Sequence, residues 1–453
     1  MWNPRTWPWW TWILVILAML VALVVSLGLV LRNQGMHELR ITIDELHARG
    51  FNVLPRDLLA RAPAVDPLRQ ARAWALFGNG GSWTSRTQPI YGPGAVASGD
   101  AEAKRILADS AAARSEWRSL YQAGPVVLSL YGWVAAHTPD PDHAGIATLA
   151  ASPIPSMLNL RNMAEALATE ARRADDPRAA LADLDALVAA GQPSGSMIDA
   201  FTCLAVAGIR DDAWLEAAAR GVIDPKPWID ARSADELAMV ADGIAAERML
   251  FGGGFVQDIH NGTLDSFAYA SFGGGLMERL AWYTTTLPVP IAAPHDVAFY
   301  LREVTKGEVL ARTGHGDVSN LGPRLRAERW RLPISAIALP DTGEAVISGA
   351  ERAFQARVSR CAAGIAWDFA HGVALPADAA HLPAAVAALV PATAFAPTLR
   401  YTRLSATRFR LDCDPATPPT DLLPTGRIEA WKPIKERFKQ TKWGLEWDLA
   451  PQP

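Results

Sequence analysis

We consider three pairs of histidine and carboxylate residues for acid–base chemistry. They are Asp258 with His260, His315 with Asp317, and Asp368 with His371. A histidine oriented by a carboxylate can act as a general base when a nucleophile or a metal ion lies beside it. The second pair belongs to the loop-like sequence TGHGD, which has neither partner nearby and is better read as surface polar residues.

The spacing of the other two pairs also argues against catalysis. Asp258 and His260 are two residues apart and would face different ways on a helix. Asp368 and His371 share a helical face, but a histidine in a last turn also interacts favourably with the helix dipole. We therefore predict a local helix-end pair there and assign no catalytic residue.

The sequence lacks the common nucleophile, phosphate and metal motifs. It contains no G-x-S-x-G, no G-x-x-x-x-G-K-[ST] and no H-E-x-x-H. The FGGG runs at 251–255 and 272–276 have no following lysine, so we predict flexible turns or close packing of loop backbone. No cofactor-binding or metal-ligating residue is assigned.

The three cysteines, Cys203, Cys361 and Cys413, are too few and too scattered for a zinc site. Cys361 and Cys413 could form a disulfide in an oxidising compartment. The alternative is that all three are buried thiols that pack as small hydrophobic side chains.

Composition excludes two broad classes. The 453 residues carry 43 Lys+Arg against 47 Asp+Glu, a formal net charge of −4, so a chain-wide nucleic-acid-binding surface is not expected. Hydrophobic residues make up 50% and charged residues 20%, which predicts a folded chain with a sizeable core rather than a disordered one.

Residues 1–34 are predicted to form an N-terminal transmembrane anchor. The run Ile13–Leu31 is apolar or small throughout, tryptophans crowd its leading edge, and Arg32 follows it. At about 1.5 Å per residue such a helix nearly crosses a hydrocarbon core of about 30 Å. Since no small-x-small cleavage site follows, we expect an uncleaved signal anchor, a cytoplasmic N-terminus and an extracytoplasmic body.

Two helical segments are expected next. Residues 35–150 read as juxtamembrane helices and a loop: a short helix capped by Gly50, a Gly/Ser/Pro-rich loop over 78–100, and a helix from Asp100 towards Tyr121. Residues 151–250 read as an array of helical hairpins without a strict repeat period. Its inward faces are predicted from helical spacing to carry Met157, Leu160, Ala164, Leu167 and Ala171; Leu181, Leu184, Leu187 and Val188; Met197, Phe201 and Leu204; Trp214 and Ala218; and Leu237, Val240, Ala241 and Ile244.

Helix starts in this array are marked by capping residues. Asp176-Pro177 supplies a capping carboxylate and a proline at the first helical position. Ser233 with Glu236 forms a capping box before the last of these helices.

The C-terminal half is less regular. Residues 251–343 form a Gly/Pro-rich irregular region with one helix from His295 to about Arg312. Residues 344–426 contain a long helix to about Gly372, a short helix over 382–390, and candidate strands at 399–404 and 408–413. Residues 427–453 form a basic, Trp-containing tail that could lie on an anionic membrane surface, dock on a partner, or be an ordinary solvated terminus.

Two stretches carry a family resemblance. LHARGFNVLPRDL, soon after the span, and residues 179–219 resemble uncharacterised, membrane-anchored proteins of Planctomycetes and Verrucomicrobia. Residues 353–415, with HLPAAVAALVP followed by LRYTRLSATRFRL, resemble a degraded pseudopilin-type end. The usual Asp-Pro-Phe-x-Gly linker and the acidic calcium-type run are absent, so the resemblance implies location and architecture but neither calcium binding nor an activity.

We therefore expect a mostly α protein with one transmembrane helix, stacked helical hairpins and a small α+β C-terminal part. The function expected is an extracytoplasmic interaction or scaffold protein of the bacterial envelope, with the lipid bilayer and a protein as partners and no nucleic acid. Two alternatives remain open. One is an envelope hydrolase with a His/carboxylate site that spacing does not reveal, in which His260, His315 or His371 would cluster with carboxylates. The other is an accessory subunit of a larger membrane complex, which would expose an apolar patch.

Overall fold

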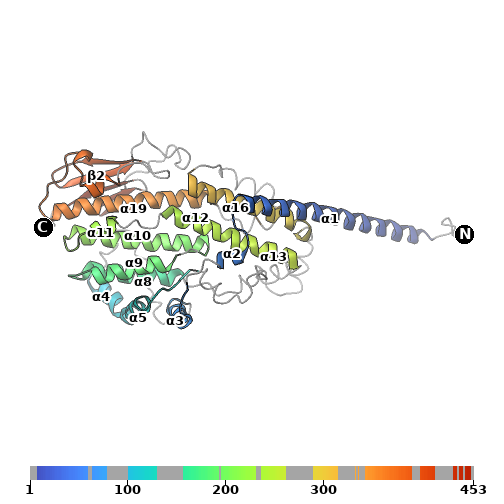
Figure 1. The fold of residues 1–453 in the computed structure, drawn as a ribbon, viewed down its shortest axis with the longest axis horizontal. Coiled ribbons are helices and arrows are strands. Elements are labelled where there is room, and N and C mark those ends of the chain that lie inside the picture. The colour runs from blue at the N-terminus through green and yellow to red at the C-terminus, as the bar shows by residue number, and fades with distance from the viewer. Residues whose placement is uncertain are drawn as a thin grey trace.

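The computed structural model shows an elongated helical body with one long helix, α1, projecting from one end (Figure 1). It describes residues 8–59, 64–78, 100–129, 157–192, 195–230, 236–261, 289–314, 332, 335, 342–389, 398–413, 432–435, 438–441 and 444–449. A small antiparallel sheet lies at the end of the body away from α1 (Figure 1). The predicted mostly helical fold, with a single N-terminal apolar helix and a C-terminal sheet, is confirmed.

Helix α1 runs without interruption from Trp9 to Ala48. The predicted separate short helix after the span is not present, because nothing between Leu31 and Ala48 breaks α1. At its end the Gly50 amide donates to the His47 carbonyl and the Phe51 amide to the Leu46 carbonyl. With Gly50 at a φ of 82°, this is the glycine-dependent Schellman ending that the sequence predicts.

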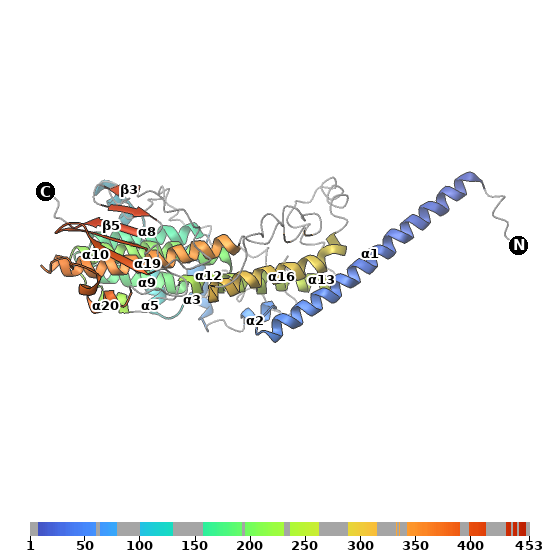
Figure 2. The same cartoon turned by 90° about the horizontal axis from the view of Figure 1, so that it is seen from above.

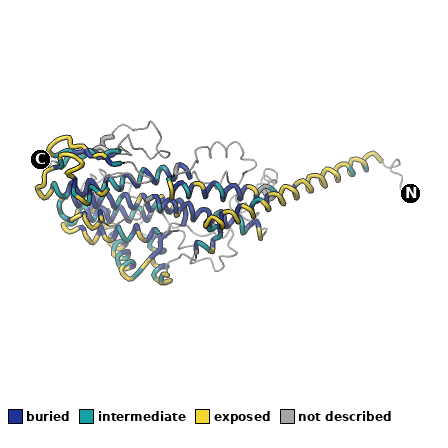
Figure 3. Tube along the Cα trace, turned by 45° about the horizontal axis from the view of Figure 1, so that its top comes forward, coloured by how far each residue is buried: buried dark blue, intermediate teal, exposed yellow. Residues whose placement is uncertain are grey.

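The apolar part of α1 stands clear of the body. Most side chains from Trp9 to Leu31 are exposed, and Figure 3 shows the outer half of the helix as almost wholly exposed. Among the described residues this is the one helix long and apolar enough to cross a membrane.

The inner half of α1 packs along α16 (Val289–Thr313), as Figure 2 shows. The buried residues of α1 are Gly28, Gly35, Leu39, Thr42 and Leu46. Their separations of seven, four, three and four residues keep them on one side of the helix, as in a coiled-coil seam. A Cβ on Gly28 would lie 2.9 Å from Ile291 Cδ1, and one on Gly35 would lie 3.1 Å from the backbone nitrogen of His295.

Four shorter helices follow α1. They are α2 (Pro55–Leu59), α3 (Pro67–Phe77), α4 (Asp100–Asp109) and α5 (Ala111–Gln122). The single helix predicted from Asp100 towards Tyr121 is wrong, because the chain turns at Ser110, whose hydroxyl donates to the Ile106 carbonyl at 2.7 Å. The predicted loop over 78–100 lies almost entirely outside the described residues.

The predicted hairpin array is formed by α8 (Met157–Arg173), α9 (Arg178–Ala190) and α10 (Met197–Ala219). The predicted apolar faces of α8 and α9 are buried wherever the side chains are described. The two faces expected for separate helices at 197–204 and 214–218 belong to the one helix α10, since no residue between them breaks it. Phe201 points outward, 37% exposed, so its predicted inward position is wrong.

The start of α9 differs slightly from the prediction. The Asp176 carboxylate accepts from the Arg178 amide at 3.1 Å, and Pro177 precedes the first helical residue, Arg178. Ser233, the predicted capping residue of the next helix, lies outside the described residues. That helix, α12 (Glu236–Glu247), buries Leu237, Val240, Ala241 and Ile244 as expected.

The first FGGG run is helical, which corrects the prediction of loop backbone. The short helix α11 (Lys226–Asp230) precedes α12 in the chain. Helix α12 itself continues through a π-helical turn, η3 (Arg248–Gly252), into α13 (Gly253–Asn261). Close packing explains the glycines, since a Cβ on Gly252 would lie 2.6 Å from Leu301 and one on Gly253 would collide with the Val53 carbonyl. The second FGGG run lies outside the described residues.

Helix α19 (Thr342–Ala370) is the long C-terminal helix and packs against α10 and α12. Its predicted inward residues Val346, Ala350, Phe354, Val358 and Ile365 are all buried. Short turns, η4 (Ala379–His381) and α20 (Ala384–Ala387), follow it in place of the single helix expected over 382–390. Helix α16 begins six residues before the predicted start at His295 and includes Pro294.

The sheet has the strand order β1-β2-β5-β4-β3 and is antiparallel throughout. The predicted strands are β1 (Leu399–Arg403) and β2 (Arg408–Cys413). The tail supplies β3 (Lys432–Lys435), β4 (Phe438–Thr441) and β5 (Gly444–Asp448). The expectation of a solvated or membrane-lying terminus is therefore wrong for β5, which pairs with β2 and buries Leu445.

The buried apolar side chains form two clusters. The larger runs through the body from Ala73 to Leu445 and joins the helical array to the sheet. The smaller lies at the α1 end and unites Leu39 and Leu46 with Met249, Phe255 and Leu301. The inner half of α1 is thus part of the core.

Candidate functional site

The three predicted histidine–carboxylate pairs do not assemble into one site in the described chain. Asp258 is buried on α13, whereas His260 in its last turn is exposed. His315 and Asp317 lie outside the described residues. Helix α13 lies near α1, whereas the far end of α19, which His371 follows, lies at the opposite end of the body (Figure 1). His260 and His371 therefore do not share a pocket, and this removes one support of the hydrolase alternative.

Asp368 and His371 lie at the C-terminal end of α19, as predicted, but the His371 imidazole contacts Trp367 instead of pairing with the Asp368 carboxylate. The His371 Nδ1 lies 2.8 Å from the Trp367 carbonyl oxygen, and its ring lies 3.9 Å from the Trp367 ring, centroid to centroid. Burial and the negative charge of Asp224 raise the pKa of Asp368. The imidazole thus contacts backbone and indole at the helix end.

All three cysteines are free thiols. Cys203 and Cys361 are buried, and burial raises the pKa of each to about 12. Both therefore stay protonated at neutral pH and are poor nucleophiles. The proposed pairing of Cys361 with Cys413 is absent, and the alternative of packed thiols fits the two buried cysteines.

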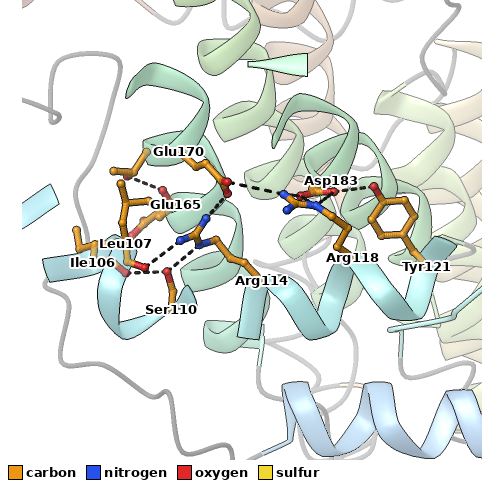
Figure 4. Close-up of polar contacts among 10 residues, drawn as sticks. Ile106, Leu107, Ser110, Arg114, Arg118, Tyr121, Glu165, Glu170 and Asp183 are labelled. Atoms are coloured by element: carbon orange, nitrogen blue, oxygen red, sulfur yellow. Dashed lines mark hydrogen bonds and ion pairs between the residues drawn. The ribbon is translucent and has the colours of Figure 1, made fainter. Parts of the chain in front are cut away.

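A polar cluster lies where α5 packs across α8 and α9 (Figure 4). We call Arg114, Arg118, Tyr121, Glu170 and Asp183 the α5 cluster. The Asp183 carboxylate is fully buried and accepts from Arg118 Nε at 2.9 Å and from the Tyr121 hydroxyl at 2.6 Å. Burial and this hydrogen bond raise the pKa of Tyr121 to about 12.

The other half of the α5 cluster joins the same helix to α8. Arg114 pairs with Glu170 and also donates to Ser110 Oγ at 3.1 Å and to the Leu107 carbonyl at 2.9 Å. Arg114 and Arg118 therefore both make their ion pairs and hydrogen bonds with groups of the protein itself. Sequence spacing does not reveal this cluster, because its bonded members lie on different helices, up to 65 residues apart in the sequence.

A second charged group lies between α8, α10 and α19. Arg210 pairs with Asp211 at 2.8 Å, and Arg352 on α19 reaches the other Asp211 oxygen at 3.4 Å. The neighbouring Asp212 has its pKa raised to about 7, chiefly by burial. Arg172 on α8 pairs with Glu216 at 2.8 Å, so the charges link α10 to two neighbouring helices.

A buried carboxyl from α12 caps the start of α10. The Glu247 Oε1 accepts from the Met197 amide at 2.9 Å, while Asp199 accepts from the Gly195 amide at 3.0 Å. Burial, aided by the nearby Asp199 charge and partly opposed by the hydrogen bond from the Met197 amide, raises the pKa of Glu247 to about 7. The buried Tyr300 hydroxyl has no hydrogen-bond partner within the described structure.

The remaining group joins α1 to α16 just beyond the apolar run. Glu38 on α1 contacts both His295 and Arg302 on α16, and we call these three residues the Glu38 cluster. Burial alone would raise the pKa of Glu38, but the hydrogen bonds and positive charges of its two partners outweigh burial and lower it. The carboxylate is therefore held in its charged form between the two helices.

These arrangements fix helices rather than expose reactive groups. Each described cluster pairs opposite charges, or a carboxyl with backbone amides, across two or more helices. No group of three or more His, Cys, Asp or Glu side chains in the described part of the chain could hold a metal ion. Comparison of the sequence and structure with known protein families, curated proteins and solved structures finds no match.

Proposed function

We propose that this protein is a single-span, membrane-anchored scaffold of the bacterial envelope, with a cytoplasmic N-terminus and an extracytoplasmic helical body. The main support is that α1 continues without a break from the apolar run into the core, where Leu39 and Leu46 are buried. A tether that only held an enzyme at the membrane would need no such rigid connection. A scaffold must hold its surfaces at a set height and angle, which this connection supplies.

The resemblance of residues 353–415 to a pseudopilin-type end extends the proposal to a pilin-like or secretion assembly. Its strands fall at 399–403 and 408–413, where the LRYTR and RFRL sequences place them. This remains a proposal about assembly partners.

One surface feature favours a protein partner and therefore also the accessory-subunit form of the proposal. Ile198 is 59% exposed and Phe201 37% exposed, one helical turn apart on α10. Large apolar side chains that adjoin on a helix face are typical of protein contacts. We infer that this face of α10 meets an apolar surface of another envelope protein.

The test is chemical cross-linking in intact membranes, followed by purification in mild detergent and mass spectrometry. The wild type should give a reproducible partner, and an I198E/F201E variant should lose it. V373E, at another exposed apolar position, is the matched control and should retain it. The scaffold proposal fails if the wild type yields no reproducible partner, and the α10 contact fails if V373E and I198E/F201E behave alike.

A further inference from the structure

The start of α16 lies beside the last part of the apolar run of α1. Ile291 Cδ1 approaches Gly28 so closely that a Cβ there would lie 2.9 Å away. Gly28 precedes Leu31, the last residue of the run, by three residues, which is about 4.5 Å of helix. The first turn of α16 therefore lies at a level where α1 is still apolar.

The two helices run parallel, and both change from apolar to polar sequence at the same level. Gly28 contacts Ile291, and Gly35 contacts Pro294 and His295. Further along, Glu38 contacts His295 and Arg302. The residue numbers of the contacting pairs thus increase in the same direction along both helices. On α1 the charges begin at Arg32. On α16 residues 289–294 read VPIAAP, and the polar residues begin at His295.

The surroundings of α1 at this level are apolar on every described side. Leu27, Leu29, Val30 and Leu31 are each about half exposed or more, while Gly28 alone faces α16. Side chains so exposed on a membrane-spanning helix meet lipid. A residue packed on the same turn of the helix must lie in the same layer.

We propose that the first turn of α16, around Ile291, inserts into the membrane surface next to α1, so that the body contacts lipid at a second point. Ile291 on this turn is partly exposed, and the partner is the boundary between acyl chains and headgroups of the same bilayer. The Glu38 cluster lies above it on the aqueous side, where charged groups keep their hydration. The inference rests on α1 spanning the membrane as proposed above.

The test measures the depth of single spin labels in proteoliposomes. Cys413, the one partly exposed cysteine, is replaced by serine, and a label is placed by L29C, I291C or I41C. Leu29 is the reference in lipid, and Ile41, exposed on α1 beyond the Glu38 cluster, is the reference in water. Collision with oxygen relative to a water-soluble nickel chelate rises as a label enters lipid.

The label at 291 should give an oxygen-to-nickel ratio near that at 29 and well above that at 41. A ratio at 291 equal to that at 41 overturns this inference alone. If the label at 29 is itself as accessible to nickel as that at 41, α1 is not embedded and the proposed function falls instead.

A second measurement needs no substitution and therefore avoids disturbing the contact between Ile291 and Gly28. The unmodified protein is reconstituted with lipids that carry a photoactivatable group on the upper acyl chain, and its adducts are mapped by mass spectrometry. Adducts should appear on α1 up to Leu31 and within residues 289–294 of α16. Adducts confined to α1 overturn the inference.

Discussion

At the residue scale, the carboxyl of Glu247 is an acid held in a place that favours its neutral form. Its pKa is raised by burial from an ordinary 4.5 to about 7, and its oxygen accepts from the first amide of α10. An acid with a raised pKa binds its proton more tightly in the folded state than in the unfolded state. Its contribution to stability is therefore full below about pH 4.5 and is lost as pH rises towards 7.

We expect E247Q to remove this pH dependence. Glutamine keeps the acceptor oxygen but cannot ionise, so the variant should gain stability relative to wild type between pH 5 and pH 8, by up to about 3 kcal/mol. Urea unfolding in detergent at the two pH values measures the difference. E45Q, at an exposed position of α1, is the control and should track the wild type. A constant gap between E247Q and wild type across this range would contradict the assignment.

The α5 cluster gives a second residue-scale prediction. D183N keeps the size of the side chain but leaves Arg118 opposite a neutral group, and breaking such a buried pair costs about 3–5 kcal/mol. Asp183 has no exposed surface, but the Arg118 side chain is 33% exposed, so we expect the loss at the lower end of this range. E116Q, which breaks the exposed Arg72–Glu116 pair of 2.6 Å, should cost at most about 1 kcal/mol. Equal losses of unfolding free energy in the two variants would show that the buried ion pair of the α5 cluster contributes no more to stability than an exposed one.

At the scale of elements, the contact between α1 and α16 depends on glycines that let the helices approach. In G35L the new side chain would meet the His295 backbone and Pro294, whose nearest atoms already lie 3.1 and 3.3 Å from an added Cβ. We expect a loss of about 1–3 kcal/mol from overpacking. Hydrogen exchange should rise along α16, while membrane association stays unchanged. L29A, on the exposed side of α1, is the control. Equal hydrogen exchange along α16 in both variants would contradict a stabilising contact between α1 and α16 at Gly35.

Elements with strong local signals were predictable from the sequence. The apolar run, the Gly50 ending, the inward faces of α8, α9 and α19, and strands β1 and β2 all follow from spacing or capping residues. Strands β3 to β5 were not predicted, because KPIK, FKQT and GLEWD are too short to show a clear alternation of apolar and polar residues, and only their pairing reveals a sheet. The helical FGGG run was missed for a similar reason, since its glycines respond to tertiary contacts with Val53 and Leu301.

The candidate site was the least predictable part. Its charged groups join helices that are far apart in the sequence, such as Glu38 with Arg302 and Arg114 with Glu170. Pairs that are near in sequence, such as Asp258 with His260, are easily considered as candidate catalytic pairs, although the fold separates their side chains. Sequence spacing reports contacts within one helix and is silent on contacts between helices.

At the scale of the whole molecule, α1 contributes both to the proposed anchor and to the core. A chain beginning at residue 33 should leave the membrane fraction but remain folded, because Leu39 and Leu46 are kept. A chain beginning at residue 50 should lose this packing and unfold at a lower temperature. Carbonate extraction and thermal unfolding by circular dichroism check both outcomes. If the two truncated chains melt alike, the inner half of α1 is only a tether.

Strand β5 is made after the other four strands that the structure describes, yet it lies in the middle of the sheet between β2 and β4. The β1–β2 and β3–β4 hairpins can each form while the ribosome is still adding residues, but they have no shared partner until Gly444–Asp448 emerges. Loss of those five residues by proteolysis or an early stop codon would therefore divide the sheet into two hairpins. The β1–β2 hairpin would keep its packing on the helical core, whereas β3–β4 would lose its pairing to the rest of the sheet, and a lone hairpin is at best marginally stable in water.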